Sequence, residues 1–240
     1  MPFTLAHPAA ALPFRRYCPR LFSFPALVAG TLSPDVGYCF GALNLDEFSH
    51  SLRGSMAFCL PAGVVMLGLF YGLRQPVVKN LPERYRKLFL PFCRHPLGSP
   101  WIALFSLLVG IGLHLLLDSF THKQGWLVLN LPLLQTPVFS VGRHTFRIFN
   151  LLWYACSFTG IVWLYLAWER WRYTVAGVEP EIANRKTLVK AVIAAVLMIP
   201  IELMHHLVPE PGDLILMAGY SALLVIGAIW RIEHKDLTQR

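Results

Sequence analysis

Three side chains that commonly bind metal ions lie four residues apart near the end of an apolar stretch. In the sequence GLHLLLDSFTH, residues 112–122, they are His114, Asp118 and His122. On a helix these positions form one polar stripe about 12 Å long, because each step of four residues turns the helix by only about 40°. One ion with ligand distances of about 2.0–2.2 Å can take two residues at this spacing. Reaching the third residue needs a second ion or a curved side-chain geometry, so the spacing favours a two-metal site.

A structural role is the alternative interpretation of this stripe. His114 and Asp118 would then form hydrogen bonds within a helical bundle, and His122 would mark the boundary with water. However, a carboxylate at the centre of a membrane helix costs on the order of 2.5–3.5 kcal/mol to insert. Such a residue is a functional candidate by default, and two imidazoles with a divalent ion are a suitable partner for it.

Three further residues of the same kinds precede residue 55: His7 in FTLAHPAA, Asp35 in GTLSPDVGY and His50 in EFSHSLRGS. Each is a weak signal alone, because an isolated histidine is more often structural and Ser-Pro-Asp is typical of a turn. With the stripe they make six nitrogen or oxygen ligands and no thiolate. That mixture suits a catalytic Zn²⁺ or Mn²⁺ cluster. Asp35 or Asp118 is the expected catalytic carboxylate, bridging two ions or orienting a water molecule.

The composition predicts that the chain is a membrane protein, so these residues would be positioned by membrane helices. The 240 residues are 55% hydrophobic and only 14% charged, with a mean hydropathy of +0.52, whereas soluble domains are about 25% charged. Several apolar stretches approach the roughly 20 residues of a spanning helix. They cover residues 55–73, 100–120, 148–168, 187–208 and 214–230. We therefore expect an all-α integral membrane bundle of about five spans, forming a single domain over residues 1–240.

Residues 1–54 differ from the predicted bundle of residues 55–240. They are rich in proline and glycine and are interrupted by arginines, the first of them Arg15 and Arg16. The charges follow the first apolar run and no small-residue cleavage site ends a clean apolar core, so the pattern is not that of a signal peptide. We expect a retained segment that packs against the bundle, with a short helix at 26–32, and that contributes to the metal site.

The distribution of basic residues predicts an orientation. The net charge of +8 comes largely from loops beside the predicted spans, which favours membrane anchoring over nucleic-acid binding. The positive-inside rule places the loops at 74–98 and 169–186 and the C-terminus in the cytoplasm, and the N-terminal segment outside. The second span then ends outside near His122. The metal site is therefore expected at the outer face of the membrane.

A second polar cluster occurs in IPIELMHHLVPE, where Glu202 and His206 share a helix face and His205 is adjacent. The favoured interpretation is a polar helix end at the membrane interface. The alternative is that these residues replace or support the metal ligands, since Glu-x-x-His spacing is typical of carboxylate metal sites in bundles.

Four stretches of the sequence also resemble a known family. They are MPFTLAHPAAALPF, LSPDVGY, SHSLRG and LHLLLDSFTHKQGW, and together they are similar to DUF4184, a family of bacterial membrane proteins of unknown function, over about residues 1–170. That family resembles in turn the membrane-bound metal-dependent hydrolases, and its pattern is similar to zinc phospholipase C and related phosphoesterases. The resemblance implies a bacterial inner-membrane hydrolase with a divalent metal bound by His7, Asp35, His50, His114, Asp118 and His122.

Two classes of function follow from these observations. The first is a metal-dependent hydrolase acting on a phosphoester, and the position near the membrane boundary favours a lipid-linked or amphiphilic substrate in contact with membrane lipid. The second is a non-enzymatic protein, either a metal or proton carrier or a scaffold. A carrier needs ligands across the whole membrane, but residues 101–110 of the second span offer only Ser106. This difference favours the enzyme.

Overall fold

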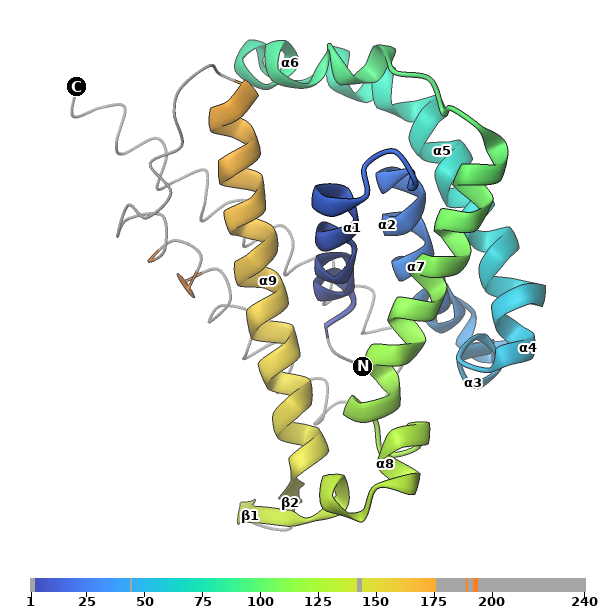
Figure 1. Ribbon diagram of the computed structural model, residues 1–240, viewed down its shortest axis with the longest axis vertical. Helices are drawn as coiled ribbons and strands as arrows, with labels where there is room; N and C mark the ends of the chain where they lie inside the picture. The colour runs from blue at the N-terminus through green and yellow to red at the C-terminus, as the bar shows by residue number, and fades with distance from the viewer. Residues whose placement is uncertain (1–2, 44, 142–143, 176–188, 190–191, 194–240) are drawn as a thin grey trace.

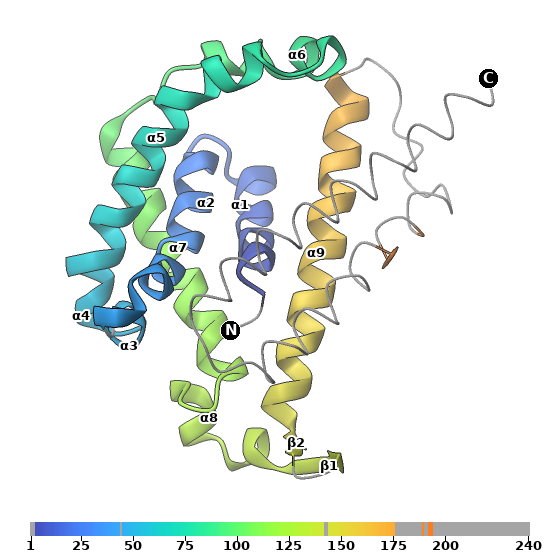
Figure 2. The same cartoon turned by 180° about the vertical axis from the view of Figure 1, so that it is seen from behind.

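The computed structural model of the chain describes residues 3–43, 45–141, 144–175, 189 and 192–193. They form a helical bundle with one short hairpin, which confirms the predicted all-α class (Figures 1 and 2). Its long helices are α5 (Leu60–Lys79), α7 (Pro100–Thr121) and α9 (Ile148–Val175). The shorter elements are η1 (Thr4–Ala11), α1 (Leu12–Tyr17), α2 (Phe24–Leu32), η2 (Pro34–Leu43), α3 (Leu45–Ser49), α4 (Leu52–Gly54), η3 (Ser55–Cys59), α6 (Glu83–Phe89), η4 (Phe92–Arg94), α8 (Trp126–Asn130), η5 (Pro132–Gln135), β1 (Pro137–Val141) and β2 (His144–Arg147).

Three helical stretches are long and apolar enough to cross a membrane. They are Leu52–Lys79, which joins α4, η3 and α5, together with Pro100–Thr121 and Ile148–Val175. They contain the spans predicted at 55–73, 100–120 and 148–168. Of the predicted span at 187–208 only residues 189 and 192–193 are described, and the predicted span at 214–230 lies outside the described residues. The described part of the chain is therefore that of a membrane protein with three candidate spans.

The N-terminal segment, predicted to pack against the bundle, has two of its helices between the long ones. Figures 1 and 2 show α1 and α2 between α7 and α9, with α6 across one end and α8 and the hairpin at the other. The backbone amide of Phe3 donates to Ser157 Oγ of α9 at 2.8 Å. A Cβ atom on Gly160 would lie 2.9 Å from the Cβ of Ala6, so glycine at this position lets η1 lie directly against α9.

A pair of glycines brings α2 and α7 into backbone contact. A Cβ atom on Gly30 would overlap the Leu107 carbonyl, and one on Gly110 would overlap the Leu27 carbonyl. Small residues at such crossings allow close packing of membrane helices. The helix predicted at 26–32 is confirmed by α2, which begins slightly earlier because Pro25 occupies its first turn.

Two local features differ from the sequence expectation. His122 has an extended backbone (φ −112°, ψ 145°) and follows the last residue of α7, although its N–H still donates to the Asp118 carbonyl at 3.1 Å. The β1–β2 hairpin was not predicted, because its strands of five and four residues leave no long apolar run in the sequence. Its antiparallel register pairs Phe139 with Phe146, whose rings stack at 4.7 Å.

Candidate metal centre

The two buried members of the predicted stripe lie one turn apart on α7 and face the N-terminal segment. The exposed fraction is 0% for His114 and 7% for Asp118. His114 Nε2 and Asp118 Oδ2 are 3.1 Å apart. The crossing of α2 and α7 at Gly30 and Gly110 places the next residue of α2, Thr31, against His114.

A backbone carbonyl sets the orientation of the His114 ring. His114 Nδ1 lies 2.8 Å from the carbonyl oxygen of Thr31. Because a carbonyl only accepts hydrogen bonds, Nδ1 carries the hydrogen, and in the neutral ring Nε2 presents a lone pair. Histidine ligands of metals typically make such a contact through the other nitrogen. The ring of His7 stacks on that of His114, with centroids 4.0 Å apart.

Asp35 and His50 reach the same point from outside the long helices. Asp35 lies in η2 and is 7% exposed, and His50 lies between α3 and α4. Their Oδ1 and Nε2 atoms are 3.5 Å apart. A Cβ atom on Gly37 would lie 2.5 Å from Ser49 Oγ, so glycine allows η2 and α3 to approach closely. Ser49 Oγ also contacts His50 Nδ1 at 3.1 Å, which helps to orient Nε2 inward.

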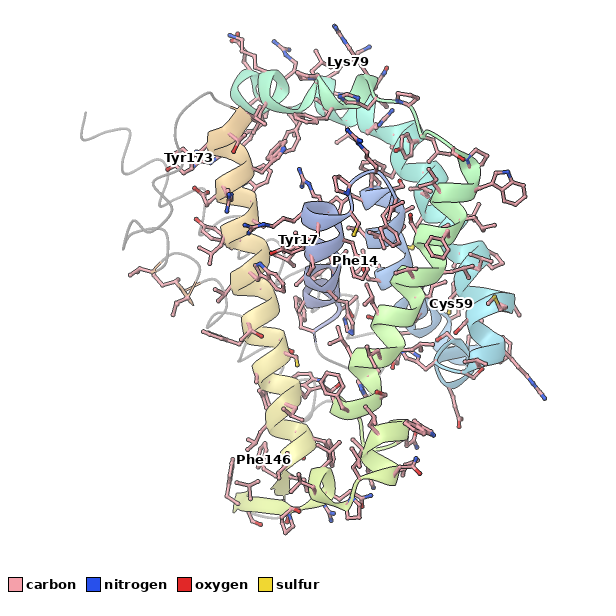
Figure 3. The ribbon with its side chains drawn as sticks, viewed as in Figure 1. Phe14, Tyr17, Cys59, Lys79, Phe146 and Tyr173 are labelled. Atoms are coloured by element: carbon pink, nitrogen blue, oxygen red, sulfur yellow. The ribbon has the colours of Figure 1, made fainter. Side chains whose placement is uncertain are left out.

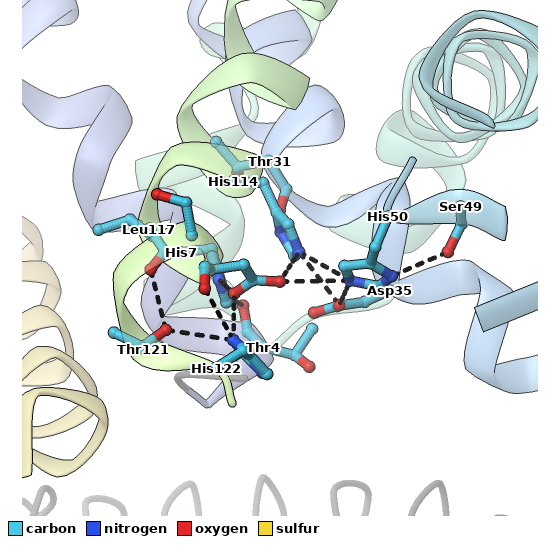
Figure 4. Close-up of polar contacts among 12 residues, drawn as sticks. Thr4, His7, Thr31, Asp35, Ser49, His50, His114, Leu117, Thr121 and His122 are labelled. Carbon is cyan, nitrogen blue, oxygen red and sulfur yellow. Dashed lines mark hydrogen bonds and ion pairs between the residues drawn. The ribbon is translucent and has the colours of Figure 1, made fainter. Parts of the chain in front are cut away.

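Four ligand atoms converge on one point (Figure 4). His114 Nε2 lies 3.3 Å from both His50 Nε2 and Asp35 Oδ1, and His50 Nε2 lies 3.3 Å from Asp118 Oδ2. With the 3.1 Å and 3.5 Å distances above, five of the six pairs among these atoms are 3.1–3.5 Å apart. Ligands at about 2.0–2.1 Å from a tetrahedral ion are separated by about 3.3–3.4 Å. The spacing of the four atoms therefore fits one divalent ion.

The remaining two predicted residues contact the other oxygen of Asp118. His7 Nε2 and His122 Nδ1 each lie 3.4 Å from Asp118 Oδ1. His7 Nδ1 lies 3.3 Å from the Thr4 carbonyl, so this ring also turns Nε2 toward the cluster. Asp118 thus has imidazoles beside both of its oxygens, which is the arrangement of a carboxylate that can bridge two ions.

Apart from the imidazole contacts described above, several buried polar atoms of the cluster have no hydrogen-bond partner in the described part of the chain. They are both carboxylate oxygens of Asp35, Oδ2 of Asp118 and Nε2 of His122. A buried charged group without such partners is unfavourable unless it is paired or coordinates a metal. Residues that could hold an ion together include His7, Asp35 and His114, and likewise His50, His114 and Asp118.

Electrostatics around the N-terminal candidate ligands, His7 and Asp35, favour their metal-binding forms. Burial and the adjacent His114 lower the pKa of His7 below its ordinary value, so its ring tends to be neutral. Burial alone raises the pKa of Asp35, but the neighbouring His114 and His50 outweigh it, and the pKa of Asp35 is lowered. Neutral imidazole and ionised carboxylate are the forms that bind metals.

The structure brings all six predicted residues into one cluster. Sequence reasoning missed the supporting contacts of the carbonyls of Thr4 and Thr31 and of the Ser49 hydroxyl, since a backbone carbonyl leaves no signal in residue type. Glu202, His205 and His206 lie outside the described residues, so their predicted roles stay predictions.

Comparison with known proteins agrees with the family resemblance. Neither the curated proteins nor the solved structures gave a match to this chain. A family model described as "Domain of unknown function (DUF4184)" matches residues 1–231, which is nearly the whole sequence. The chain therefore belongs to the DUF4184 family.

Proposed function

We propose that this protein is a membrane-embedded metal-dependent hydrolase. In this proposal the centre holds one or two divalent ions, with Zn²⁺ the expected metal and Mn²⁺ the alternative. Its ligands are His7, Asp35, His50, His114, Asp118 and His122. The observation that carries the proposal is the convergence of four ligand atoms from Asp35, His50, His114 and Asp118, with five separations of 3.1–3.5 Å.

Hydrolysis is the chemistry that this donor set serves best. A divalent ion bound by nitrogen and oxygen ligands lowers the pKa of its water toward about 7 and polarises an ester or phosphoester oxygen. Asp118 contacts one pair of imidazoles through each of its two oxygens and so fixes the two pairs relative to each other. Asp35, whose Oδ1 lies 3.3 Å from His114 Nε2 and 3.5 Å from His50 Nε2, is the second carboxylate available to orient a water molecule.

The surroundings of the centre favour an amphiphilic phosphoester as substrate, such as a lipid-linked one. The exposed edge of the cluster is formed by His50 and His122, whose side chains are 19% and 28% exposed. Phe48, two residues before His50, is 39% exposed, and Phe40 in η2 is 47% exposed. These apolar side chains suit an acyl or isoprenoid chain better than a soluble metabolite.

We place the centre at the outer face of a bacterial inner membrane. The support is the excess of lysine and arginine between the first two spans and after the third, which favours a cytoplasmic position for α6 and for the C-terminal end of α9. The cluster lies in the half of α7 that leads to α8, away from α6 (Figure 1).

The first test is elemental analysis of the detergent-purified protein. Near-stoichiometric zinc or manganese is expected in the wild type and is expected to be lost in H114A/D118A. The matched control is E47A/H95A, which removes one carboxylate and one imidazole at exposed positions and is expected to keep its metal. A screen of chromogenic and lipid phosphoesters with the metal-loaded protein then follows.

The outcomes separate the enzyme from the non-enzymatic alternative. Equal trace metal in the wild type and H114A/D118A would overturn the proposal and leave a structural polar cluster. Bound metal with no hydrolysis of any phosphoester, together with metal transport into vesicles, would favour a carrier. The half of α7 nearer to α6 argues against a carrier, which would need ligands across the whole membrane. Ser106 is the one hydroxyl residue there, and it already donates to the Ile102 carbonyl at 2.6 Å.

A further inference from the structure

We infer that a second site, remote from the metal centre, binds an anionic phospholipid through its phosphate and one acyl chain. The site is a cavity of about 540 Å³ between α1 and the C-terminal half of α9, a volume typical of small-molecule sites. Tyr17 of α1 and Tyr173 of α9, both labelled in Figure 3, belong to its walls.

The lining of this cavity carries a net positive charge. Arg15, Arg16 and Arg170 all contribute to it, and none of them forms an ion pair with a carboxylate in the described part of the chain. The acidic residue of the lining, Glu169, is already paired with Arg172 at 2.6 Å. Guanidinium groups bind phosphate through paired, charge-assisted hydrogen bonds. The three arginines, which have no carboxylate partner among the described residues, are therefore suited to a phosphate group.

The rest of the lining is apolar and aromatic. Trp163, Leu166 and Trp171 form part of the wall along α9, and Trp163 is 48% exposed. Inorganic phosphate would leave this apolar wall uncovered, whereas an acyl chain would cover it. The combination of cationic and apolar walls therefore favours an amphiphile.

The position of the cavity agrees with a lipid ligand. Its wall on α9 belongs to the half of that helix that ends beside α6 (Figure 1), where the rings of Trp171 and Phe89 stack with centroids 5.5 Å apart. Basic pockets between membrane helices at the cytoplasmic surface bind phospholipid head groups. The metal centre lies in the half of α7 that leads to α8, away from α6. Lipid binding at the cavity is therefore separate from the proposed hydrolysis.

The test measures lipid binding to the full-length protein by native mass spectrometry in a neutral detergent. The probes are phosphatidylglycerol, phosphatidylcholine and inorganic phosphate. In R15Q/R16Q/R170Q we expect the affinity for phosphatidylglycerol to fall about tenfold or more, because charge-assisted hydrogen bonds are lost. The control K79Q/R86Q/R94Q removes three exposed cations from the same end of the bundle and is expected to bind as the wild type does.

A second variant separates the cavity from its surface charge. A167F keeps all three arginines but places a larger side chain in the cavity. It is expected to weaken the binding of phosphatidylglycerol and to leave the binding of inorganic phosphate unchanged. Equal affinity in the wild type, R15Q/R16Q/R170Q and A167F would overturn the inference. An equal loss of phosphatidylglycerol affinity in the control K79Q/R86Q/R94Q would also overturn it, because that result indicates general charge attraction. Inorganic phosphate that binds as tightly as phosphatidylglycerol would overturn it too, because that result indicates a site for a free anion.

Discussion

The Nε2 atoms of His50 and His114 lie 3.3 Å apart, although 64 positions separate the two residues in the chain. His114 Nδ1 is held by the Thr31 carbonyl and His50 Nδ1 contacts the Ser49 hydroxyl. Both rings therefore turn the same nitrogen toward one point, where carboxylate oxygens of Asp35 and Asp118 also lie. Lone pairs and negative charge converging in this way require a cation, either protons on the rings or a metal ion.

Neutralising Asp35 should weaken metal binding without disturbing the fold. The Asp35→Asn side chain has nearly the same shape but lacks the charge that a divalent ion requires. Because even supporting residues around a metal contribute about 10–100-fold to affinity, loss of a direct ligand should exceed about 100-fold. Competition with a fluorescent chelator measures this change. Glu47→Gln, at an exposed position, is the matched control, and an unchanged affinity in Asp35→Asn would show that Asp35 is not a ligand.

The two sides of Asp118 should hold separable ions. His7→Ala/His122→Ala removes the imidazoles beside Oδ1 and should lower the metal content from about two ions per chain to about one. Asp35→Ala/His50→Ala removes ligands near Oδ2 and should lower the content in the same way. Inductively coupled plasma mass spectrometry against protein concentration gives the ratios. A single ion in the wild type that either pair of substitutions abolishes would show one mononuclear site.

Removing the metal should destabilise the wild-type protein. A ligand present at about 1,000 times its Kd stabilises the folded state by about 4 kcal/mol, and 1 kcal/mol corresponds to about 2–4 °C in Tm for a chain of this size. We therefore expect a strong chelator to lower the Tm by about 8–16 °C. The same chelator should leave the Tm of H114A/D118A unchanged. A fall of equal size in both proteins would indicate an effect of the chelator itself.

Gly110 should be required for the close contact of α2 and α7. A Cβ atom at this position overlaps the Leu27 carbonyl, whereas one at Gly112 meets no atom within 4 Å. Gly110→Ala should therefore cost about 1–3 kcal/mol of folding free energy through overpacking and should also weaken metal binding, because Thr31 supports His114 from α2. Gly112→Ala should be neutral or slightly stabilising, since alanine favours helix. Equal Tm values and metal affinities for the two variants would contradict this packing argument.

Much of the fold was predictable because membrane insertion places a simple demand on sequence. A spanning helix needs about 20 apolar residues, so the spans at 55–73, 100–120 and 148–168 were predicted close to the observed helices. The hairpin at β1 and β2 was missed because its strands are too short for a pattern of apolar runs. The extended backbone of His122 was missed because helix ends depend on local packing as well as on residue type.

The sequence by itself determined which side chains are available for chemistry: His114 and Asp118 are one turn apart on any helix, and a carboxylate within a span needs a partner. Only the tertiary structure decided that Asp35 and His50 supply atoms at the same point, and which nitrogen each ring presents. Those facts depend on the close contact of Gly30 with Gly110 and on carbonyl acceptors such as that of Thr31. The physical reason is that ligand geometry is set by distances between segments remote in sequence, and these distances arise from packing, which residue spacing does not record.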